Sequence, residues 1–175
     1  DRSPAEKRKP PNIVVYLIDT LRPDHLGCYG YGRKVSPCID EFAREAVLFE
    51  QVQAQSCWTK TAVASLFTSL LPPQHGAFDF GDRLPAKLTT LAEQLRSHGY
   101  RTQGWTANVY VSDTFGFEQG FDHYQCLGGA GSHQIHEKVV AWLNRSSQKD
   151  SPFFLYIHSM DPHAPYDPPA AFRSV

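Results

Sequence analysis

The hydrophobic and polar positions of this chain divide it into short segments of two kinds. Continuous apolar runs over residues 12–19 and 152–159 predict strands that are buried on both faces of a parallel sheet. Residues 100–107, which follow a helix stop at Gly99, and the short run 47–52 predict two further strands. Polar side chains follow the long strands, at the end where open α/β sheets collect ligands.

Apolar residues spaced three and four positions apart predict helices between these strands. Ser36 and Pro37 are typical of a helix start, as N-cap and first residue, and helices are also expected over 88–98 and 132–144. Strands and helices alternate and no internal repeat occurs, so the sequence predicts an α/β fold. Its central sheet is expected to be largely parallel, with helices on both faces.

The run SCWTKTAVASLFT at residues 56–68 is the segment around which the chemistry is expected to gather. It predicts a loop that enters a helix, and Pro72-Pro73 ends that helix. Thr59, Lys60 and Thr61 then lie at the helix N-terminus, where unpaired N–H groups and the helix dipole favour anions. A threonine hydroxyl at this place is either an N-cap or a nucleophile, and the local pattern favours the cap.

Four strand ends or loop–helix junctions offer polar groups that could share one edge of the sheet. They are Asp19, Thr59 with Lys60, Asn108, and Asp161 with His163. A carboxylate that holds a divalent cation, a hydroxyl, a lysine and a histidine suit the transfer of an anionic ester group. The lysine would stabilise the equatorial oxygens, and the histidine would protonate the leaving oxygen or orient the transferred group.

Composition narrows the class of protein. The 175 residues are 41% hydrophobic and 20% charged, as in ordinary globular domains, and 17 Lys and Arg against 18 Asp and Glu give no basic footprint for nucleic acid. No apolar run approaches the ~20 residues of a membrane span. The four cysteines (Cys28, Cys38, Cys57 and Cys126) lack zinc spacing and form either disulfides or free thiols.

Residues 1–11, DRSPAEKRKPP, are polar and proline-rich and predict a flexible N-terminal tail. Such a tail is typical of a mature protein from which a signal or lipoprotein anchor has been removed, or of an artificial start of the chain. The first of these alternatives predicts an extracytoplasmic location, which is either periplasmic or secreted.

Several motifs taken together resemble the sulfatase family of the alkaline-phosphatase-like superfamily. They are NIVVYLIDTLRPDHLGCYGYG, SPCIDEFA, WTKTAVASLFTSLLPPQHG, LTTLAEQLRSHGYRT, FGFEQGFDHY and FFLYIHSMDPHAPYDPP. They occur in the family's order and cover nearly the whole chain after residue 11. The resemblance implies that residues 12–175 form the N-terminal portion of a sulfatase-like catalytic domain, truncated before its C-terminal part.

The resemblance also implies a set of site residues. Asp19 would bind a divalent metal (Ca, Mg, Mn or Zn), and Thr20 stands where many members carry a second acidic ligand. Thr59 would be the nucleophile and a further contact to the metal. The remaining implied residues are Lys60 and His163 in catalysis, and Asn108 and Asp161 in substrate binding.

The chain departs from the family at the nucleophile. Sulfatases that carry formylglycine form it from a Cys or Ser within a C/S-x-P-x-R signature. Here Thr59 stands at that position without the Pro or the Arg, and Cys57 fails the signature because Thr59 and Thr61 follow it at +2 and +4. No formylglycine is therefore expected. Threonine nucleophiles of this superfamily belong to phosphodiesterases and phospho-headgroup transferases, which favours phosphoryl transfer.

Two further departures concern the rest of the site. Phe80 lies at about the place where related members have a polar Asn that contacts the oxyanion. The chain also ends at Val175, before the segment in which the family carries its remaining metal ligands and a lysine. A sheet built to be flanked by later strands exposes an apolar edge, so we expect either self-association or a missing C-terminal segment.

Three hypotheses for the function remain open at this point. The first is a metal-dependent hydrolase of sulfate or phosphate esters in which Thr59 attacks the ester. The second is a non-catalytic sulfatase-like domain that binds an anionic ligand or a partner chain. The third is that Thr59 only caps its helix, in which case Thr59→Ala costs about 1 kcal/mol of stability and no property depends on metal.

Overall fold

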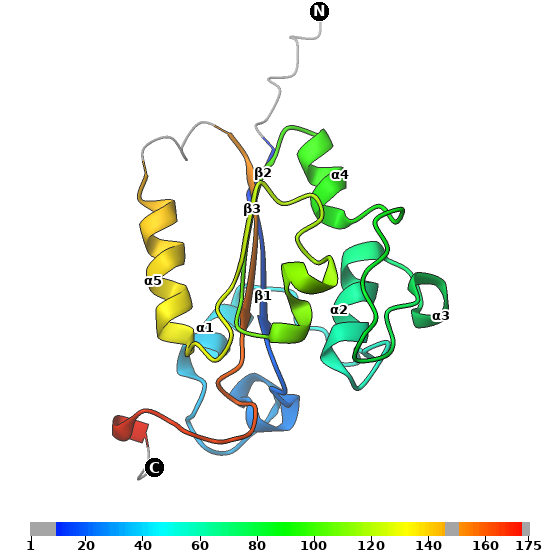
Figure 1. The fold of residues 1–175 in the computed structure, drawn as a ribbon. Helices are drawn as coiled ribbons and strands as arrows, with labels where there is room; N and C mark the ends of the chain where they lie inside the picture. Colours follow the sequence, from blue (N-terminus) through cyan, green and yellow to red (C-terminus); the bar gives the residue numbers. More distant parts are fainter. Residues whose placement is uncertain (1–9, 146–150, 173–175) are drawn as a thin grey trace, which may run out of the picture.

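The central sheet has four strands, which are all parallel. A computed structural model of the chain describes residues 10–145 and 151–172. Its strands are β1 (Ile13–Ile18), β2 (Arg101–Thr106), β3 (His123–Cys126) and β4 (Phe153–Ser159), and they lie in the order β1-β4-β2-β3 (Figure 1). Each neighbouring pair runs parallel. Because all four strands point the same way, their carboxyl ends meet at one edge of the sheet.

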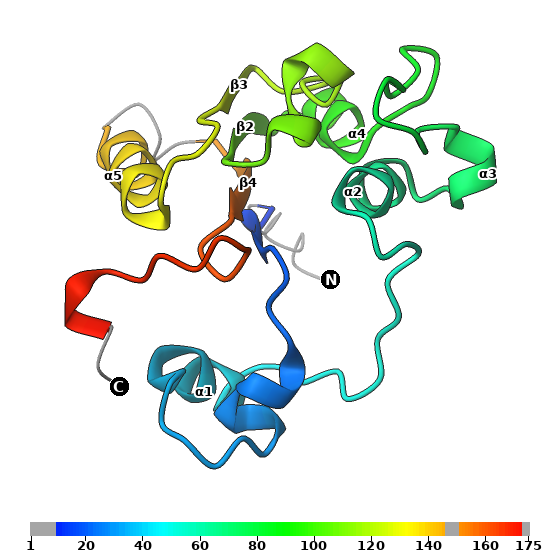
Figure 2. The ribbon, with the colours of Figure 1, turned by 60° about the horizontal axis from the view of Figure 1, so that its bottom comes forward.

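Helices cover both faces of the sheet, which confirms the predicted α/β architecture. The helix α5 (Ser132–Leu143) lies on one face, and α2 (Thr59–Thr68) and α4 (Leu91–Ser97) lie on the other (Figure 1). Figure 2 shows α1 (Pro37–Arg44) apart from the sheet and α3 (Pro72–His75) beside α2. The short 3₁₀ helices are η1 (Pro23–His25), η2 (Gly27–Tyr29), η3 (Val109–Val111), η4 (Asp113–Phe115) and η6 (Ala170–Phe172).

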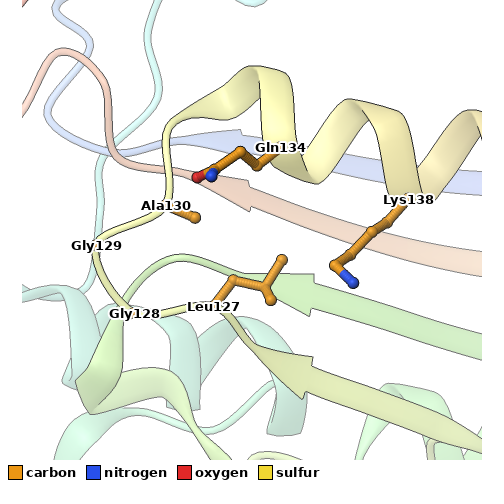
Figure 3. Close-up of a pocket in the computed structure, with 6 residues that line it drawn as sticks. All are labelled: Leu127, Gly128, Gly129, Ala130, Gln134 and Lys138. Atoms are coloured by element: carbon orange, nitrogen blue, oxygen red, sulfur yellow. The ribbon is translucent and has the colours of Figure 1, made fainter.

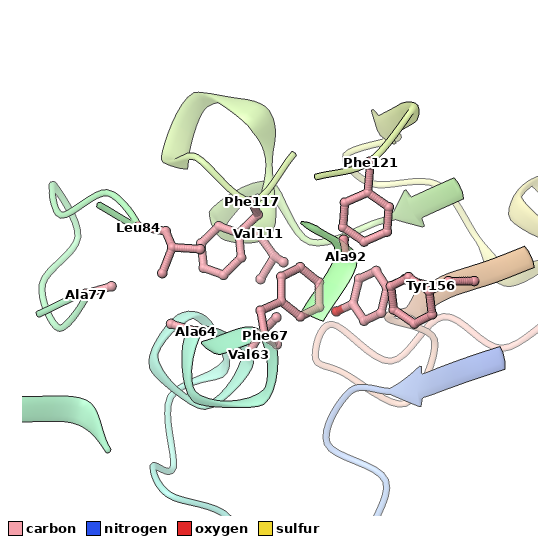
Figure 4. Close-up of a cluster of buried hydrophobic side chains, with 11 residues drawn as sticks. Val63, Ala64, Phe67, Ala77, Leu84, Ala92, Val111, Phe117, Phe121 and Tyr156 are labelled. Carbon is pink, nitrogen blue, oxygen red and sulfur yellow. The ribbon is translucent and has the colours of Figure 1, made fainter. Parts of the chain in front are cut away.

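Two hydrophobic clusters hold these layers together. The larger one packs α2 and α4 against the sheet, and the ring centroid of Phe67 on α2 lies 4.9 Å from that of Tyr156 on β4 (Figure 4). The second cluster packs α5 against the opposite face through residues that include Trp105 and Ile135. Successive side chains of β4 enter alternate clusters, so this central strand is buried on both faces, as its continuous apolar run predicted.

The structure differs from the predicted elements in two places. Residues 47–52 are not a strand, and Val47 and Val52 are 80% and 74% exposed. A run without a partner strand cannot form a ladder, so hydrophobic character alone was an insufficient signal. No strand was predicted at β3, whose Tyr124 ring fills the space at Gly104, where a Cβ atom would lie 2.4 Å from that ring. This strand depends on tertiary packing more than on a local apolar pattern.

Helix boundaries follow local chemistry that refines the predicted ranges. α2 ends at Thr68, and its C-cap Ser69 has a left-handed backbone (φ 57°). Pro72 then begins α3, so it does more than end α2. α4 begins at Leu91, inside the predicted range 88–98 but three residues after its start, because Thr90 and Glu93 form a reciprocal capping box. These capping interactions fix where each helix starts within the apolar pattern.

Several sequence predictions concern the sheet edge, the cysteines and the N-terminal tail. β1 was predicted to be buried on both faces, but among the described strands it pairs with β4 alone, and its Val14 and Tyr16 are 54% and 43% exposed. Self-association through this edge stays a prediction. All four cysteines are free thiols. No helix in the described part of the chain has the length and apolar character needed to cross a bilayer. The predicted flexible tail lies outside the described residues, apart from the exposed residues 10 and 11.

We predict that Phe67→Ala removes the main packing contact of α2. The Phe67 ring is 3% exposed and lies 5.7–5.9 Å from the rings of Phe117 and Phe121, so its loss leaves a cavity in the larger cluster. The free energy of unfolding in urea should fall by about 3–5 kcal/mol. Phe42→Ala is the matched control, because Phe42 is 74% exposed on α1, and it should change stability by less than about 0.5 kcal/mol.

Candidate functional site

The side chains that meet at the carboxyl edge of the sheet converge on one carboxylate, Asp19. Asp19 follows β1 directly, and its backbone N–H donates to the carbonyl of Ser159, which extends the β1–β4 ladder by one residue. Asn108 follows β2, and His158 lies on β4 between these two strands. Thr59 is the first residue of α2, on the helix that packs against this part of the sheet. Parallel strands and one helix start thus bring four side chains together.

The Asp19 carboxylate accepts hydrogen bonds from the other three residues. Thr59 Oγ1 lies 3.1 Å from Oδ2 and 3.3 Å from Oδ1, and Asn108 Nδ2 lies 3.1 Å from Oδ2. His158 Nε2 also lies 3.1 Å from Oδ2. Asp19 is only 5% exposed, so these donors replace the water that a carboxylate would otherwise bind. We call these four residues the Asp19 cluster.

The pKa of Asp19 reflects a balance between burial and these donors. Burial alone raises the pKa of the carboxyl group, because a charge is costly away from water. The hydrogen bonds from His158, Asn108 and Thr59 outweigh burial and hold the pKa of Asp19 below its usual value. The carboxylate is therefore ionised at neutral pH and can accept a hydrogen bond or help to hold a cation.

His158 is the residue of this cluster that the sequence analysis missed. Its ring is fully buried, and Nδ1 lies 3.1 Å from the Tyr156 hydroxyl and 3.3 Å from Thr106 Oγ1. Burial raises the pKa of Tyr156 well above its usual value, so its hydroxyl keeps its proton and can donate to Nδ1. The partners therefore assign the ring proton to Nε2, facing Asp19. A histidine inside an otherwise apolar strand was the available signal.

Thr59 does not act as the helix cap. The N-cap of α2 is Trp58, which makes no side-chain capping bond, and the Thr59 hydroxyl donates instead to Asp19. The first N–H groups of a helix have no partners within the helix, so α2 presents its positive end beside Thr59. This arrangement places a hydroxyl, an ionised carboxylate and an anion-favouring helix end at one point.

Thr20, predicted as a metal contact, has an unusual backbone. Its φ of 57° lies in the left-handed region, which β-branched residues rarely adopt. Such a conformation costs on the order of 1–2 kcal/mol and is found mostly where function requires it. The side chain is exposed directly after Asp19. The turn at Thr20 therefore directs the chain away from the sheet immediately after the carboxylate.

Lys60 is not brought to the Asp19 cluster. Its side chain is fully buried, and Nζ donates to the carbonyls of Asp79 and Phe80 at 3.0 and 2.9 Å. Nζ also lies 3.8 Å from the ring centroid of Phe115. Burial lowers the pKa of this ammonium group, and the nearby charges of Asp82 and Asp79 oppose that shift in part. Lys60 thus ties the loop that follows α3 to the start of α2.

Asp161 and His163 make their hydrogen bonds outside the Asp19 cluster. Asp161 accepts bonds from Ser132 N at 3.0 and 3.1 Å and from Ser132 Oγ at 3.0 Å, so it caps α5, whose own N-cap is Gly131. His163 is exposed, and its Nδ1 lies 2.6 Å from the carbonyl of Ala164. Among the contacts described for residues 10–145 and 151–172, neither side chain hydrogen-bonds to Asp19.

A hollow of about 420 Å³ opens at another part of the same sheet edge (Figure 3). It lies between the loop after β3 and the first turns of α5. Its lining consists of Leu127, Gly128, Gly129, Ala130, Gln134 and Lys138. None of these residues belongs to the Asp19 cluster, and Lys138 is the only charged side chain among them. We assign it no role in the reaction.

The Asp19 cluster offers the type of ligand atom that the implied divalent metal prefers, but too few such ligands. The oxygens of Asp19 and Thr59 are hard donors of the type that Ca, Mg and Mn prefer. Within the described ranges, however, no group of three His, Cys, Asp or Glu side chains could hold an ion. One carboxylate and one hydroxyl form only part of a coordination sphere. Asp19 and Thr59 alone therefore do not complete a metal site.

Comparison with known proteins identifies the relatives of this chain. A family model described as Sulfatase matches residues 11–174. Iduronate 2-sulfatase of Mus musculus is 25% identical over 94% of this chain and 37% of its own length. N-acetylglucosamine-6-O-sulfatase of Bacteroides thetaiotaomicron is 23% identical over 93% of this chain and 32% of its own length. The chain therefore spans about a third of the length of these relatives.

Solved structures give the same fold. A protein in complex with its substrate D-glucosamine-2-N,6-O-disulfate superposes with a TM-score of 0.79 at 23% identity, covering 91% of this chain and 36% of that one. The phosphonate monoester hydrolase of Agrobacterium radiobacter superposes with a TM-score of 0.76 at 19% identity, covering 92% and 43%. At these identities, the two likenesses establish the fold alone.

We predict that Asp19→Asn lowers stability in a pH-dependent way. The folded-state pKa of Asp19 is depressed, so its ionised form contributes stability above the unfolded-state pKa. Wild type should exceed the variant by about 1–3 kcal/mol in the free energy of unfolding at pH 7, and the difference should shrink as the pH falls below about 4, the ordinary aspartate pKa, and through the depressed folded-state pKa. Urea unfolding at a series of pH values measures this, and a difference that stays constant down to pH 2 would contradict it.

Proposed function

The chain belongs to the sulfatase family, and on that premise we propose that it carries the nucleophile of a metal-dependent hydrolase of sulfate or phosphate esters. One observation carries the proposal. The Thr59 hydroxyl, at the first residue of α2, donates to an ionised and buried carboxylate 3.1 Å away. A hydroxyl at a helix start, hydrogen-bonded to a group that can take its proton, is the arrangement that nucleophilic catalysis requires.

In the proposed reaction, Thr59 Oγ1 forms a bond to the sulfur or phosphorus atom, and the bond from that atom to the leaving oxygen breaks. The Thr59 proton passes to Asp19, which already accepts a hydrogen bond from it. His163, on the segment after β4, gives a proton to the leaving oxygen. Water, which gives a proton to His163, then forms a bond to the sulfur or phosphorus atom, the bond from that atom to Thr59 Oγ1 breaks, and Asp19 returns the proton to the threonine oxygen. The free N–H groups at the start of α2 stabilise the charge on the equatorial oxygens.

A divalent metal held in part by Asp19 and Thr59 would lower the pKa of the threonine hydroxyl and draw charge from the ester oxygens. Thr20 stands next to Asp19 and is the remaining residue that we assign to this metal. Asn108 keeps Asp19 in place from one side, since its Nδ2 donates to Oδ2, and His158 does so from another. We assign Lys60 to anchoring the start of α2 and Asp161 to capping α5 beside the substrate.

We propose that phosphorus is the preferred centre. Thr59 stands at the position of the formylglycine precursor without its signature, and threonine nucleophiles of this superfamily belong to enzymes of phosphoryl transfer. The hydrolase of Agrobacterium radiobacter acts on phosphonate monoesters and shares this fold. Relatives named for sulfated sugars support the sulfate alternative. The proposed partner is the ester substrate and not nucleic acid, and the proposed location is extracytoplasmic.

A second candidate function is a non-catalytic domain that binds an anionic ligand. The observation in its favour is that Asp19 is the single carboxylate of its cluster and that no complete set of metal ligands occurs in the part of the chain that the structure describes. In this case the start of α2 still attracts an anion, but Thr59 does not react. Thr59→Ala would then leave the affinity for sulfate or phosphate nearly unchanged.

Turnover by the chain tests the proposal. We expect hydrolysis of an aryl phosphate, aryl phosphodiester or aryl sulfate in the presence of at least one of Ca, Mg, Mn and Zn. Thr59→Ala should lower kcat by about 10³-fold or more, because it removes the attacking oxygen. Thr59→Ser, which keeps a hydroxyl, should retain measurable turnover.

The matched control is Thr68→Ala, at the other end of the same helix. The Thr68 hydroxyl donates to the carbonyl of Ala64 within α2 and has no link to Asp19, so its loss should leave kcat unchanged. Absence of turnover with every metal, combined with sulfate or phosphate affinity that Thr59→Ala does not alter, would favour the non-catalytic domain.

A further inference from the structure

Three aromatic side chains form a cluster beside Thr59 that the proposed reaction does not use. The ring centroid of Trp58 lies 5.0 Å from that of Phe80 and 6.1 Å from that of Tyr110, and Phe80 and Tyr110 are 5.6 Å apart. Phe80 is 69% exposed, and Trp58 and Tyr110 are half-buried. We call these three residues the ring cluster.

The ring cluster is attached to the Asp19 cluster at two points of the backbone. Trp58 is the N-cap of α2 and directly precedes Thr59. Tyr110 lies two residues after Asn108, and its N–H donates to Asn108 Oδ1 at 2.9 Å. The same asparagine donates to Asp19, so two of the three rings belong to residues within two positions of members of the Asp19 cluster.

The third ring is held in place despite its exposure. The carbonyl of Phe80 accepts a hydrogen bond from the buried Lys60 ammonium at 2.9 Å. Asp82 accepts hydrogen bonds from the N–H groups of Phe78 and Asp79 at 2.8 and 2.7 Å, which closes the loop around Phe80. A ring that is fixed before binding loses less conformational freedom when a ligand packs on it.

The charge around the rings limits what they can bind. Lys60 Nζ lies 5.6 Å from the ring centroid of Trp58, so a positive charge already faces that ring from inside the protein. A cationic ligand would be repelled by Lys60, and an anion would gain nothing from the negative faces of the rings. A neutral ring with an apolar face suits both constraints.

We propose that the ring cluster is a subsite for the organic part of the ester, which it holds by stacking on the apolar face of a neutral six-membered ring. This inference rests on the proposed function, since it assigns the leaving group of that reaction. Both an aryl ring and a pyranose present such a face. The transferred anionic group would then lie toward Thr59 and the start of α2, with the leaving ring over Phe80 and its neighbours.

Binding of the leaving group alone tests the subsite without any need for turnover. Phenol and methyl β-glucopyranoside are titrated separately into the chain while the indole N–H resonance of Trp58, assigned by Trp58→Phe, is followed by NMR. We expect a saturable shift with at least one of the two, with a Kd in the millimolar range. A response to phenol alone assigns an aryl leaving group, and a response to the glucoside assigns a sugar.

Phe80→Ala should raise that Kd by about three- to tenfold, because it removes one stacking ring. Phe80→Tyr keeps the ring and should bind as wild type does. Phe49→Ala is the matched control, because Phe49 is 67% exposed against 69% for Phe80 and lies outside the cluster. Since Phe80 is exposed, its removal should leave the thermal midpoint nearly unchanged.

Two results would overturn the subsite. One is the absence of a saturable Trp58 shift with both neutral rings, and the other is a shift that Phe80→Ala leaves intact. Saturable binding of tetramethylammonium would overturn the assignment of a neutral ligand. The proposed hydrolase activity is tested separately from the subsite. Ring binding without ester turnover would support the subsite and contradict the proposed reaction. Ester turnover with a KM that Phe80→Ala does not change would support the reaction and contradict the subsite.

Discussion

Burial of a single carboxylate at the edge of the sheet is the constraint on which the site depends. Asp19 is almost inaccessible to water, so its charge must be compensated by hydrogen-bond donors. The donors come from three separate parts of the fold: the start of α2, the loop after β2 and the inner strand β4. Any shift of one element would leave a buried charge partly unsatisfied. The same interaction that keeps Asp19 ionised therefore fixes where Thr59 stands relative to the sheet.

The remainder of the fold provides rigid supports for these donors. β4 is central and packed on both faces, and its Tyr156 serves two purposes: its ring packs on Phe67 of α2, and its hydroxyl orients His158. Hydrophobic packing of α2 and the polar cluster at its first residue are thus linked through one tyrosine. The packing of large apolar side chains holds α2 in a position that lets the Thr59 hydroxyl reach Asp19 at hydrogen-bonding distance.

The sequence predicted the parts of this arrangement that have strong local patterns. The apolar runs ending near Asp19 and His158 predicted the strands β1 and β4, although only β4 is buried on both faces. The carboxyl-edge rule placed Asp19, Thr59 and Asn108 together. Sequence analysis failed where the presence of a partner strand decides whether a segment forms a strand. Residues 47–52 are hydrophobic but have no strand to pair with, and β3 is polar in sequence but is held by the contact of Tyr124 with Gly104. His158 was overlooked because a polar residue within an apolar strand reads as part of the strand.

Lys60 shows most clearly why neighbours in sequence need not share a site. Adjacent residues of a helix point in directions about 100° apart, so Thr59 and Lys60 cannot both face Asp19 from the first turn of α2. Thr59 faces the sheet edge, and Lys60 turns inward to the carbonyls of Asp79 and Phe80. Burying an ammonium group is unfavourable unless its protons are bonded, and the two carbonyls and the Phe115 ring meet that need. The lysine therefore acts on the site through the backbone, by fixing the loop that carries Phe80 against the helix that carries Thr59.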